Sequence, residues 1–320
     1  MSTDALSSRG LRNYLLVTIA YWAFTITDGA IHMLVVLHFH QLGFSSLEIA
    51  LLFLFYEFFG IVTNAVGGYV ATRLGLNTTL FLGMAMQIFS LTMLAVDPSR
   101  LSVPYVMFFM ALSGIAKDLN KMSAKSSVKL MVPEGSDSRL FQWVAILTGS
   151  KNSLKGAGFF LGGLLLGVWG FQLALIGLAG GLCLTLLLTA SMLPREMGKT
   201  KSTIKFSSLF AKTPEINRLS GARFFLFGSR DVWFTVGLPV FLQEVLQWNH
   251  TQVGSFFALW IMGYGLIQAA APGLLRRKGQ DQGPDGPTAR YLAFGLAVLP
   301  AGIAVCMQQG LDPNLTLILG

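Results

Sequence analysis

Lysines and arginines occur inside stretches of the chain that are otherwise apolar. The six that we assign to substrate binding are Lys117, Lys121, Lys125, Lys151, Lys155 and Arg230. The first three of these are spaced four residues apart, as are the next two, and four residues advance an α-helix by about 400°, so each set shares one helix face. Lys and Arg are common ligands of phosphate-type anions. The pattern therefore predicts a water-filled cationic cavity that binds a small anion of more than one charge.

Acidic residues are fewer in the same apolar stretches. We assign three of them, Asp28, Glu57 and Asp231, to proton coupling, and add the histidine His32 to this set. Asp28 and His32 are four residues apart and can relay a proton, since histidine titrates near neutral pH; the alternative is a structural hydrogen-bonded pair. Glu57 is either a buried proton site or the partner of a cavity lysine. Asp118 lies three positions before Lys121, which favours a pair within one helix.

The composition excludes most soluble classes of protein. The chain has 320 residues, of which 53% are hydrophobic and 12% charged, whereas a typical soluble domain is about 25% charged. An ordinary cytosolic enzyme, a disordered protein and a disulfide-stapled domain are therefore excluded, and an integral membrane protein remains. Cys183 and Cys306 have no metal-ligand or disulfide spacing, so no metal site and no cofactor is expected.

Apolar runs of about 20 residues, the length that crosses a bilayer, recur along the chain. They predict an all-α, polytopic fold with membrane spans over 14–37, 47–70, 78–96, 104–131, 140–168, 171–193, 220–245, 251–275 and 289–307. A tenth helix is expected to begin near Asn314, so the sequence resembles a longer protein cut off at Gly320.

Basic residues also predict the orientation. They concentrate in alternate loops, and the opposite loops contain only Arg100, so the positive-inside rule places the N-terminus in the cytoplasm of a multi-pass protein of the cell inner (plasma) membrane. The net charge of +8 follows largely from this bias and requires no nucleic-acid partner. Lys125 and Lys129 lie near a cytoplasmic helix end, where snorkelling to lipid headgroups is the alternative to substrate binding.

The longest basic segment divides the chain. Residues 194–219 are predicted to form a cytoplasmic linker between an N-terminal six-helix half, residues 1–193, and an incomplete C-terminal half, residues 220–320. A shift of 204 residues places Arg73 on Arg277 and relates the first two helices to the seventh and eighth in the same orientation. A parallel repeat after six helices is the arrangement of major facilitator transporters, here expected to end after about nine and a half helices.

Short motifs agree with this arrangement. The loop after the second span has Gly68, Arg73 and Gly75, which resembles the loop signature of that superfamily, although Thr72 stands where an acidic residue is usual. Gly158 and Gly162 follow Gly149 in a pattern that resembles its antiporter motif, and small residues four apart let helices approach closely.

Longer segments resemble the ArsJ-type organoarsenical efflux permeases of the major facilitator superfamily over essentially the whole chain. The segments that carry this resemblance are YWAFTITDGA at 21–30, LVVLHFH at 34–40, FLFYEFFG at 53–60, SGIAKDLNKMSAKSS at 113–127, LTGSKN at 147–152 and GSRDVWF at 228–234. Members of this family have about twelve helices. The resemblance implies export of 1-arseno-3-phosphoglycerate, made by a partner glyceraldehyde-3-phosphate dehydrogenase that uses arsenate in place of phosphate.

This substrate agrees with the predicted cavity, since it is a small polyanion with an oxyanion at each end. Our hypothesis is that the lysines hold one end and Arg230 the other during alternating access. One alternative is an organophosphate or sugar-phosphate exchanger, which would need the same cavity. A membrane-embedded enzyme is a second alternative, but no nucleophile or metal constellation accompanies the lysines.

Overall fold

The computed structural model describes residues 3–132, 137–193, 213–231, 241–242, 245–248, 250–275 and 286–310, with the single residues 238 and 317. The described residues form helices and contain no strand. The predicted linker is outside them as far as residue 212, and so is nearly all of the predicted tenth helix.

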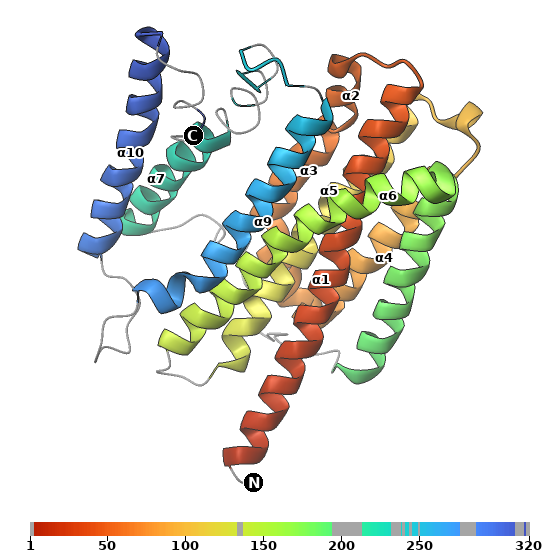
Figure 1. The fold of residues 1–320 in the computed structure, drawn as a ribbon. Coiled ribbons are helices and arrows are strands. Elements are labelled where there is room, and N and C mark those ends of the chain that lie inside the picture. The colour runs from red at the N-terminus through yellow and green to blue at the C-terminus, as the bar shows by residue number, and fades with distance from the viewer. Residues whose placement is uncertain are drawn as a thin grey trace. The chain divides into compact units, whose positions relative to one another are not determined.

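Six helices make up the N-terminal part of the chain (Figure 1). They are α1 (Thr3–Gln41), α2 (Ser46–Leu52), α3 (Leu54–Leu74), α4 (Leu76–Leu94), α5 (Val103–Met131) and α6 (Asp137–Met192). Three further helices follow, α7 (Pro214–Asp231), α9 (His250–Leu275) and α10 (Gly286–Gln308). The described residues of each predicted span are mainly helical, as the apolar runs require.

The chain divides into two compact units. The first consists of residues 1–209 together with Ala258–Pro272, which is the second half of α9. The second consists of Phe210–Phe257 and Gly273–Gly320. Within the first unit, α1 packs along α6, and α5 packs against both α3 and α4.

The structure differs from the prediction at the second span. A single helix was expected over 47–70, but α2 and α3 are separate helices interrupted at Phe53. The start of α2 is capped by Ser45, whose side chain accepts from the backbone N–H of Glu48, while Glu48 Oε2 accepts from the Ser45 backbone N–H at 2.8 Å and from its hydroxyl at 2.7 Å. This is a capping box, which fixes where the helix begins.

The predicted division between the fifth and sixth spans is a single-residue break within α6. Gly170 has a φ of 73° and a ψ of 176°, which is not helical. A positive φ favours glycine because other residues would place a Cβ against the backbone. Figure 1 shows the chain reversing its direction there, so the two spans are connected with almost no intervening loop.

Glycines bring α1 and α6 into close contact. A methyl group added to Gly158 would lie 3.1 Å from Gly29 Cα, and one added to Gly29 would lie 3.1 Å from Gly158 Cα. A methyl on Gly162 would meet the backbone of Ala30. The two backbones therefore touch where one would otherwise find side chains. The Gly158 and Gly162 motif lies against α1.

Helix α6 also contacts the second half of α9, through another part of its surface. Asn152 Nδ2 donates to Gln268 Oε1 at 2.7 Å, and Ser153 Oγ donates to the Met262 carbonyl at 3.0 Å. Gly149 meets the backbone of Gly265 and Ala269, and Gly265 meets Ser153, so neither glycine leaves room for a Cβ. Polar side chains that bond across helices are a common means of association in apolar bundles.

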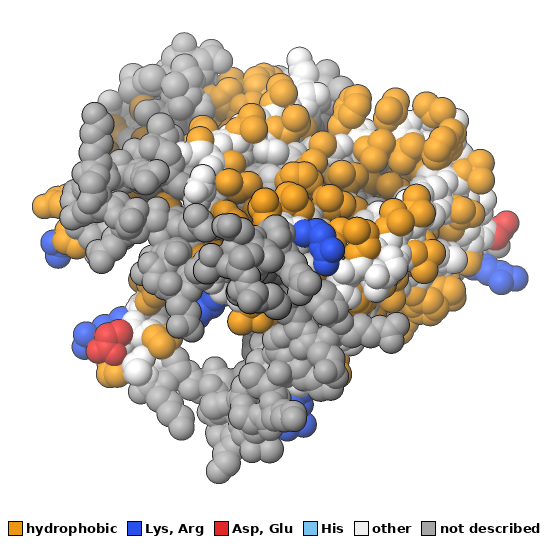
Figure 2. All heavy atoms as spheres, turned by 90° about the horizontal axis from the view of Figure 1, so that it is seen from below, with side chains coloured by type: hydrophobic (Ala, Val, Ile, Leu, Met, Phe, Trp, Pro, Cys, Tyr) orange, Lys and Arg blue, Asp and Glu red, His pale blue; other side chains and the backbone are white. Residues whose placement is uncertain are grey.

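The outer surface of the bundle is apolar. Four helical segments of the described residues are long and apolar enough to cross a membrane, namely Gly10–Gln41, Leu76–Leu94, Leu140–Met192 and Arg290–Gln308. Large side chains such as Ile61, Phe160 and Leu187 are exposed, and orange hydrophobic side chains cover much of the described surface in Figure 2. Such a surface is suited to lipid rather than to water.

The contact between α1 and α6 generates a stability prediction. A methyl added to Gly158 would lie 2.5 Å from the Ile26 carbonyl oxygen, and backbone cannot move aside cheaply. We expect Gly158→Ala to unfold at a lower temperature than the unsubstituted protein in detergent, because overpacking costs about 1–3 kcal/mol. The matched control is Gly180→Ala on the same helix, where nothing lies within 4 Å. Its midpoint should be unchanged or higher, since alanine favours helix by about 1 kcal/mol; equal midpoints for the two variants would contradict the close contact.

Candidate functional site

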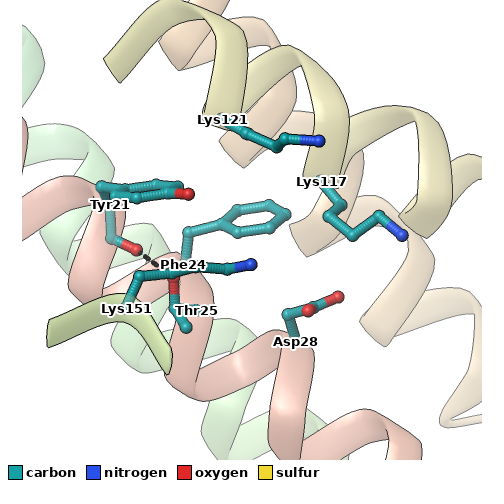
Figure 3. Close-up of a pocket in the computed structure, with 7 residues that line it drawn as sticks. All are labelled: Tyr21, Phe24, Thr25, Asp28, Lys117, Lys121 and Lys151. Atoms are coloured by element: carbon teal, nitrogen blue, oxygen red, sulfur yellow. Dashed lines mark hydrogen bonds between the residues drawn. The ribbon is translucent and has the colours of Figure 1, made fainter. Parts of the chain in front are cut away.

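A small pocket lies among α1, α5 and α6 in the first unit. Its cavity volume is about 10 Å³, which is about the space that one water molecule needs. The residues that line it are Tyr21, Phe24, Thr25, Asp28, Lys117, Lys121 and Lys151 (Figure 3). Three of the predicted lysines and one predicted carboxylate therefore converge on one space, although they come from three helices.

The carboxylate of Asp28 is the most enclosed charge at the site. The residue is 2% exposed. Its Oδ1 accepts a hydrogen bond of 2.7 Å from the Tyr56 hydroxyl of α3, and its Oδ2 lies 3.9 Å from Lys155 Nζ of α6. A buried charge is tolerated only when it is paired and hydrogen-bonded, and here both partners come from other helices.

Two lysines of α5 are also paired with carboxylates. Lys121 Nζ lies 3.0 Å from Asp118 Oδ1, the pair that their spacing predicted. Lys117 Nζ lies 3.4 Å from Glu57 Oε2 and 4.0 Å from Asp118 Oδ2. The Lys117 ammonium also lies 4.0 Å from the centre of the Tyr56 ring, which is a cation–π contact.

Lys151 differs from the other three lysines near the pocket. No hydrogen bond or ion pair joins its ammonium to any residue that the structure describes. Four lysines thus face three carboxylates, and the excess positive charge belongs to Lys151. Among the described residues of the site, the carboxylates therefore balance most of the lysine charge.

A second polar group in the pocket has no partner. The Tyr21 hydroxyl is buried and makes no hydrogen bond to the described residues, and the residue as a whole is 2% exposed. Leaving a buried donor unsatisfied costs about 1–3 kcal/mol. Thr25 is different, because its Oγ1 donates to the Tyr21 carbonyl at 2.7 Å.

The structure separates the members of the predicted proton-coupling set. His32 Nδ1 lies 2.7 Å from the backbone oxygen of Asp28, not from its carboxylate, and the ring stacks on Phe53. The two side chains are therefore not hydrogen-bonded to each other. The side chain of Glu57 is 66% exposed and pairs with Lys117, which is the second of the two alternatives stated for it.

Lys125 is not part of the pocket, and two further predicted residues, Arg230 and Asp231, have side chains outside the described residues. Lys125, one turn beyond Lys121 on α5, does not line the pocket, because each four-residue step turns the helix by a further 40°. Arg230 and Asp231 end α7, but their side chains lie outside the described residues. Among the described residues, no group of three His, Cys, Asp or Glu is arranged to hold a metal ion.

Tyr21 and Tyr56 are site residues that sequence reasoning missed. Tyr21 precedes Thr25 by four residues and Asp28 by seven, a spacing that places all three on one face of α1. Tyr56 is adjacent to Glu57, and neighbouring helical residues point about 100° apart. Tyr56 faces the interior and is fully buried, whereas Glu57 is exposed, so the buried position of this pair belongs to the tyrosine.

A comparison with protein families identifies the fold. A family model described as the Major Facilitator Superfamily matches residues 14–319. The chain belongs to the major facilitator superfamily. It is therefore a polytopic membrane protein, in agreement with its apolar helices.

The chain is similar to a solved structure of a mutant of the peptide transporter POT in complex with sulfate. The TM-score is 0.48 and the sequence identity is 17%. The match covers 97% of this chain and 63% of that chain, so this chain spans less than two thirds of its length. No curated protein matches the sequence.

The superfamily loop motif lies between α3 and α4. Gly75 separates the two helices with a φ of 90° and a ψ of 148°, a backbone conformation that favours glycine. Its N–H donates to the Ala71 carbonyl at 2.9 Å, and its carbonyl accepts from Thr79 N–H at 3.0 Å. The Arg73 guanidinium lies 4.7 Å from the centre of the Tyr69 ring, and Gly68 faces Met122 of α5.

The pairing of Asp28 generates the second prediction. Asp28→Asn removes the charge partner of Lys155 while keeping an acceptor for Tyr56. Removing one side of a buried ion pair leaves the other charge uncompensated, so we expect a loss of stability on the order of 3 kcal/mol, measured by unfolding in detergent.

The matched control for this variant is Glu57→Gln. It removes an exposed carboxylate from Lys117, which keeps its 4.0 Å contact with Asp118, and exposed pairs contribute at most about 1 kcal/mol. Equal losses of stability in the two variants would show that the Asp28 carboxylate contributes no more to the fold than the exposed Glu57 carboxylate.

Proposed function

We propose that this protein is a secondary transporter that exports an organoarsenical anion, 1-arseno-3-phosphoglycerate, by alternating access. The observation that carries the proposal is the convergence of Lys117, Lys121 and Lys151 on one pocket, with Lys155 close by on Asp28. A lysine at the centre of a membrane helix costs about 2.5–3.5 kcal/mol. Four such residues around one space are best explained by an anionic cargo.

The chemistry of the cargo matches these side chains. An arsenate ester at one end and a phosphate ester at the other provide oxygens that Lys ammonium groups bind well. The resemblance of residues 113–127 and 147–152 to the ArsJ-type permeases includes the three lysines of the pocket. This overlap connects the resemblance to the site.

The proposal places the protein in the cell inner membrane with its N-terminus in the cytoplasm. A glyceraldehyde-3-phosphate dehydrogenase supplies the cargo inside the cell, and the exported ester breaks down outside. The transporter itself is not an enzyme in this scheme. The ion that drives export is a separate question. Asp28, the buried member of the proton-coupling set, is the first residue to substitute in order to identify that ion.

An exchanger of organophosphates or sugar phosphates is the second candidate. The same lysines would bind such a cargo, because the phosphate group and the charge are shared. The two candidates differ in whether a cell needs the dehydrogenase to gain resistance to arsenate. Measuring arsenate resistance with and without the dehydrogenase therefore distinguishes the two candidate functions.

Arsenate resistance and arsenic retention should be measured in arsenic-sensitive cells that express the full-length gene, with and without the dehydrogenase. We expect resistance and low retention only when both proteins are present, because only then is the organoarsenical formed. Resistance from the transporter alone would mean that it exports arsenate or another species. The absence of resistance in both cells would favour the organophosphate exchanger.

Variants of the pocket lysines test whether the pocket carries this activity. Lys121→Gln and Lys151→Gln should each reduce resistance at least about tenfold, because a charge-assisted hydrogen bond contributes about 1.5–3 kcal/mol. The matched control is Lys129→Gln, which neutralises an exposed lysine in the last turn of α5 and should leave resistance unchanged. Full resistance in both pocket variants, at equal membrane abundance, would exclude the pocket as the transport site.

A further inference from the structure

Two hydrogen-bond donors in the pocket have no acceptor among the described residues. The first is the hydroxyl of Tyr21, which is buried. The second is the ammonium of Lys151, a partly exposed residue that lines the pocket. The other lysines near the pocket are held by carboxylates, Lys121 by Asp118 and Lys155 by Asp28. Buried polar groups in folded proteins nearly always have a partner, so the buried Tyr21 hydroxyl, in a pocket that also contains the unpaired Lys151 ammonium, calls for an occupant.

We propose that Tyr21 and Lys151 form a subsite for a tetrahedral oxyanion, a phosphate- or arsenate-type group, with the Tyr21 hydroxyl donating directly to one of its oxygens. This inference rests on the proposed function, since it assigns one end of the cargo to a defined place within the same pocket. It adds Tyr21, an uncharged residue, to the binding set. It also distinguishes Lys151, which is available to an anion, from lysines that are already paired.

The directions of the donors favour a tetrahedral group. Tyr21 belongs to α1, Lys121 to α5 and Lys151 to α6, and Figure 3 shows all three side chains extending into the region between these helices. A tyrosine provides one O–H donor and a lysine three N–H donors. Lys121 uses one of its three on Asp118. Donors from three helices suit a ligand whose oxygens point in different directions, whereas a planar carboxylate presents two oxygens in one plane.

The contacts of the Tyr21 hydroxyl distinguish a role in anion binding from a role in protein stability. The Tyr21 hydroxyl has no hydrogen-bond partner to lose among the described residues, so removing it should not weaken the unliganded protein. Tyr14, seven residues earlier on α1, has a hydroxyl that donates to the Trp143 carbonyl at 3.4 Å and does not line the pocket. The two tyrosines therefore predict opposite effects when each is replaced by phenylalanine.

The test measures binding and unfolding for the same variants. The purified protein in lipid nanodiscs is titrated calorimetrically with 3-phosphoglycerate, inorganic phosphate and glycerate, and its thermal midpoint is measured without ligand. We expect Tyr21→Phe to bind 3-phosphoglycerate about tenfold more weakly, with an unchanged or higher midpoint. Tyr14→Phe should bind normally and unfold at a lower temperature.

A double variant tests whether Tyr21 and Lys151 hold the same group. If both contact one oxyanion, the loss in Tyr21→Phe/Lys151→Gln should be smaller than the product of the two single losses. Glycerate, which lacks the tetrahedral group, should bind weakly to the unsubstituted protein and show no further loss in Tyr21→Phe. Independent losses in the double variant, or an equal effect of Tyr21→Phe on glycerate, would overturn the shared subsite.

The remaining outcomes distinguish the subsite from the proposed function. If the unsubstituted protein binds 3-phosphoglycerate and Tyr21→Phe binds it equally well, the subsite is wrong while the transport proposal stands. If the unsubstituted protein binds neither phosphorylated probe, both fall together. A lowered midpoint for Tyr21→Phe would show that its hydroxyl has a structural partner, which also overturns the inference.

Discussion

One buried carboxylate connects three helices of the first unit. Asp28 of α1 accepts from Tyr56 of α3 and pairs with Lys155 of α6, so its charge is balanced only if all three helices take their observed positions. The contact of Gly29 with Gly158 makes this possible, because it lets α1 and α6 approach closely near both Asp28 and Lys155. Bulkier residues would hold the helices apart and leave a charge unpaired in an apolar bundle. Glycine packing and charge pairing are thus two aspects of one constraint.

The pairing of the lysines with carboxylates also affects how an anion could bind. Lys117 contacts Glu57 of α3, and Lys121 contacts Asp118 of its own helix. An anion that enters must compete with these carboxylates for lysine donors, whereas Lys151 has no such competitor among the described residues. Under the proposed function, Lys151 is therefore ready for a negative group, and the other lysines become available only after rearrangement. A ligand that interacts differently with two arrangements is what shifts a conformational equilibrium.

Much of the fold could be predicted from the sequence because bilayer-length apolar runs dictate helices. The break at Gly170 was predicted in this way, since two apolar runs meet there. The interruption at Phe53 could not be, because the apolar run continues through it. In the site, the pair of Asp118 and Lys121 follows from spacing within one helix. The pairs of Asp28 with Lys155 and of Glu57 with Lys117 depend on the relative rotation of helices, which one sequence does not encode in any local pattern. Tyr21 was missed because an unsatisfied hydroxyl is visible only when its surroundings are known.

The single-residue break at Gly170 has a consequence for how the protein is made. The two spans of α6 are separated by one non-helical residue, so no polar loop emerges between them. During synthesis the second span must follow the first into the membrane as a helical hairpin, since neither has a tether long enough to wait outside. The reversal also leaves almost no segment for a protease or an inserted epitope to reach on that side of the membrane. An epitope tag is therefore best placed elsewhere in the chain.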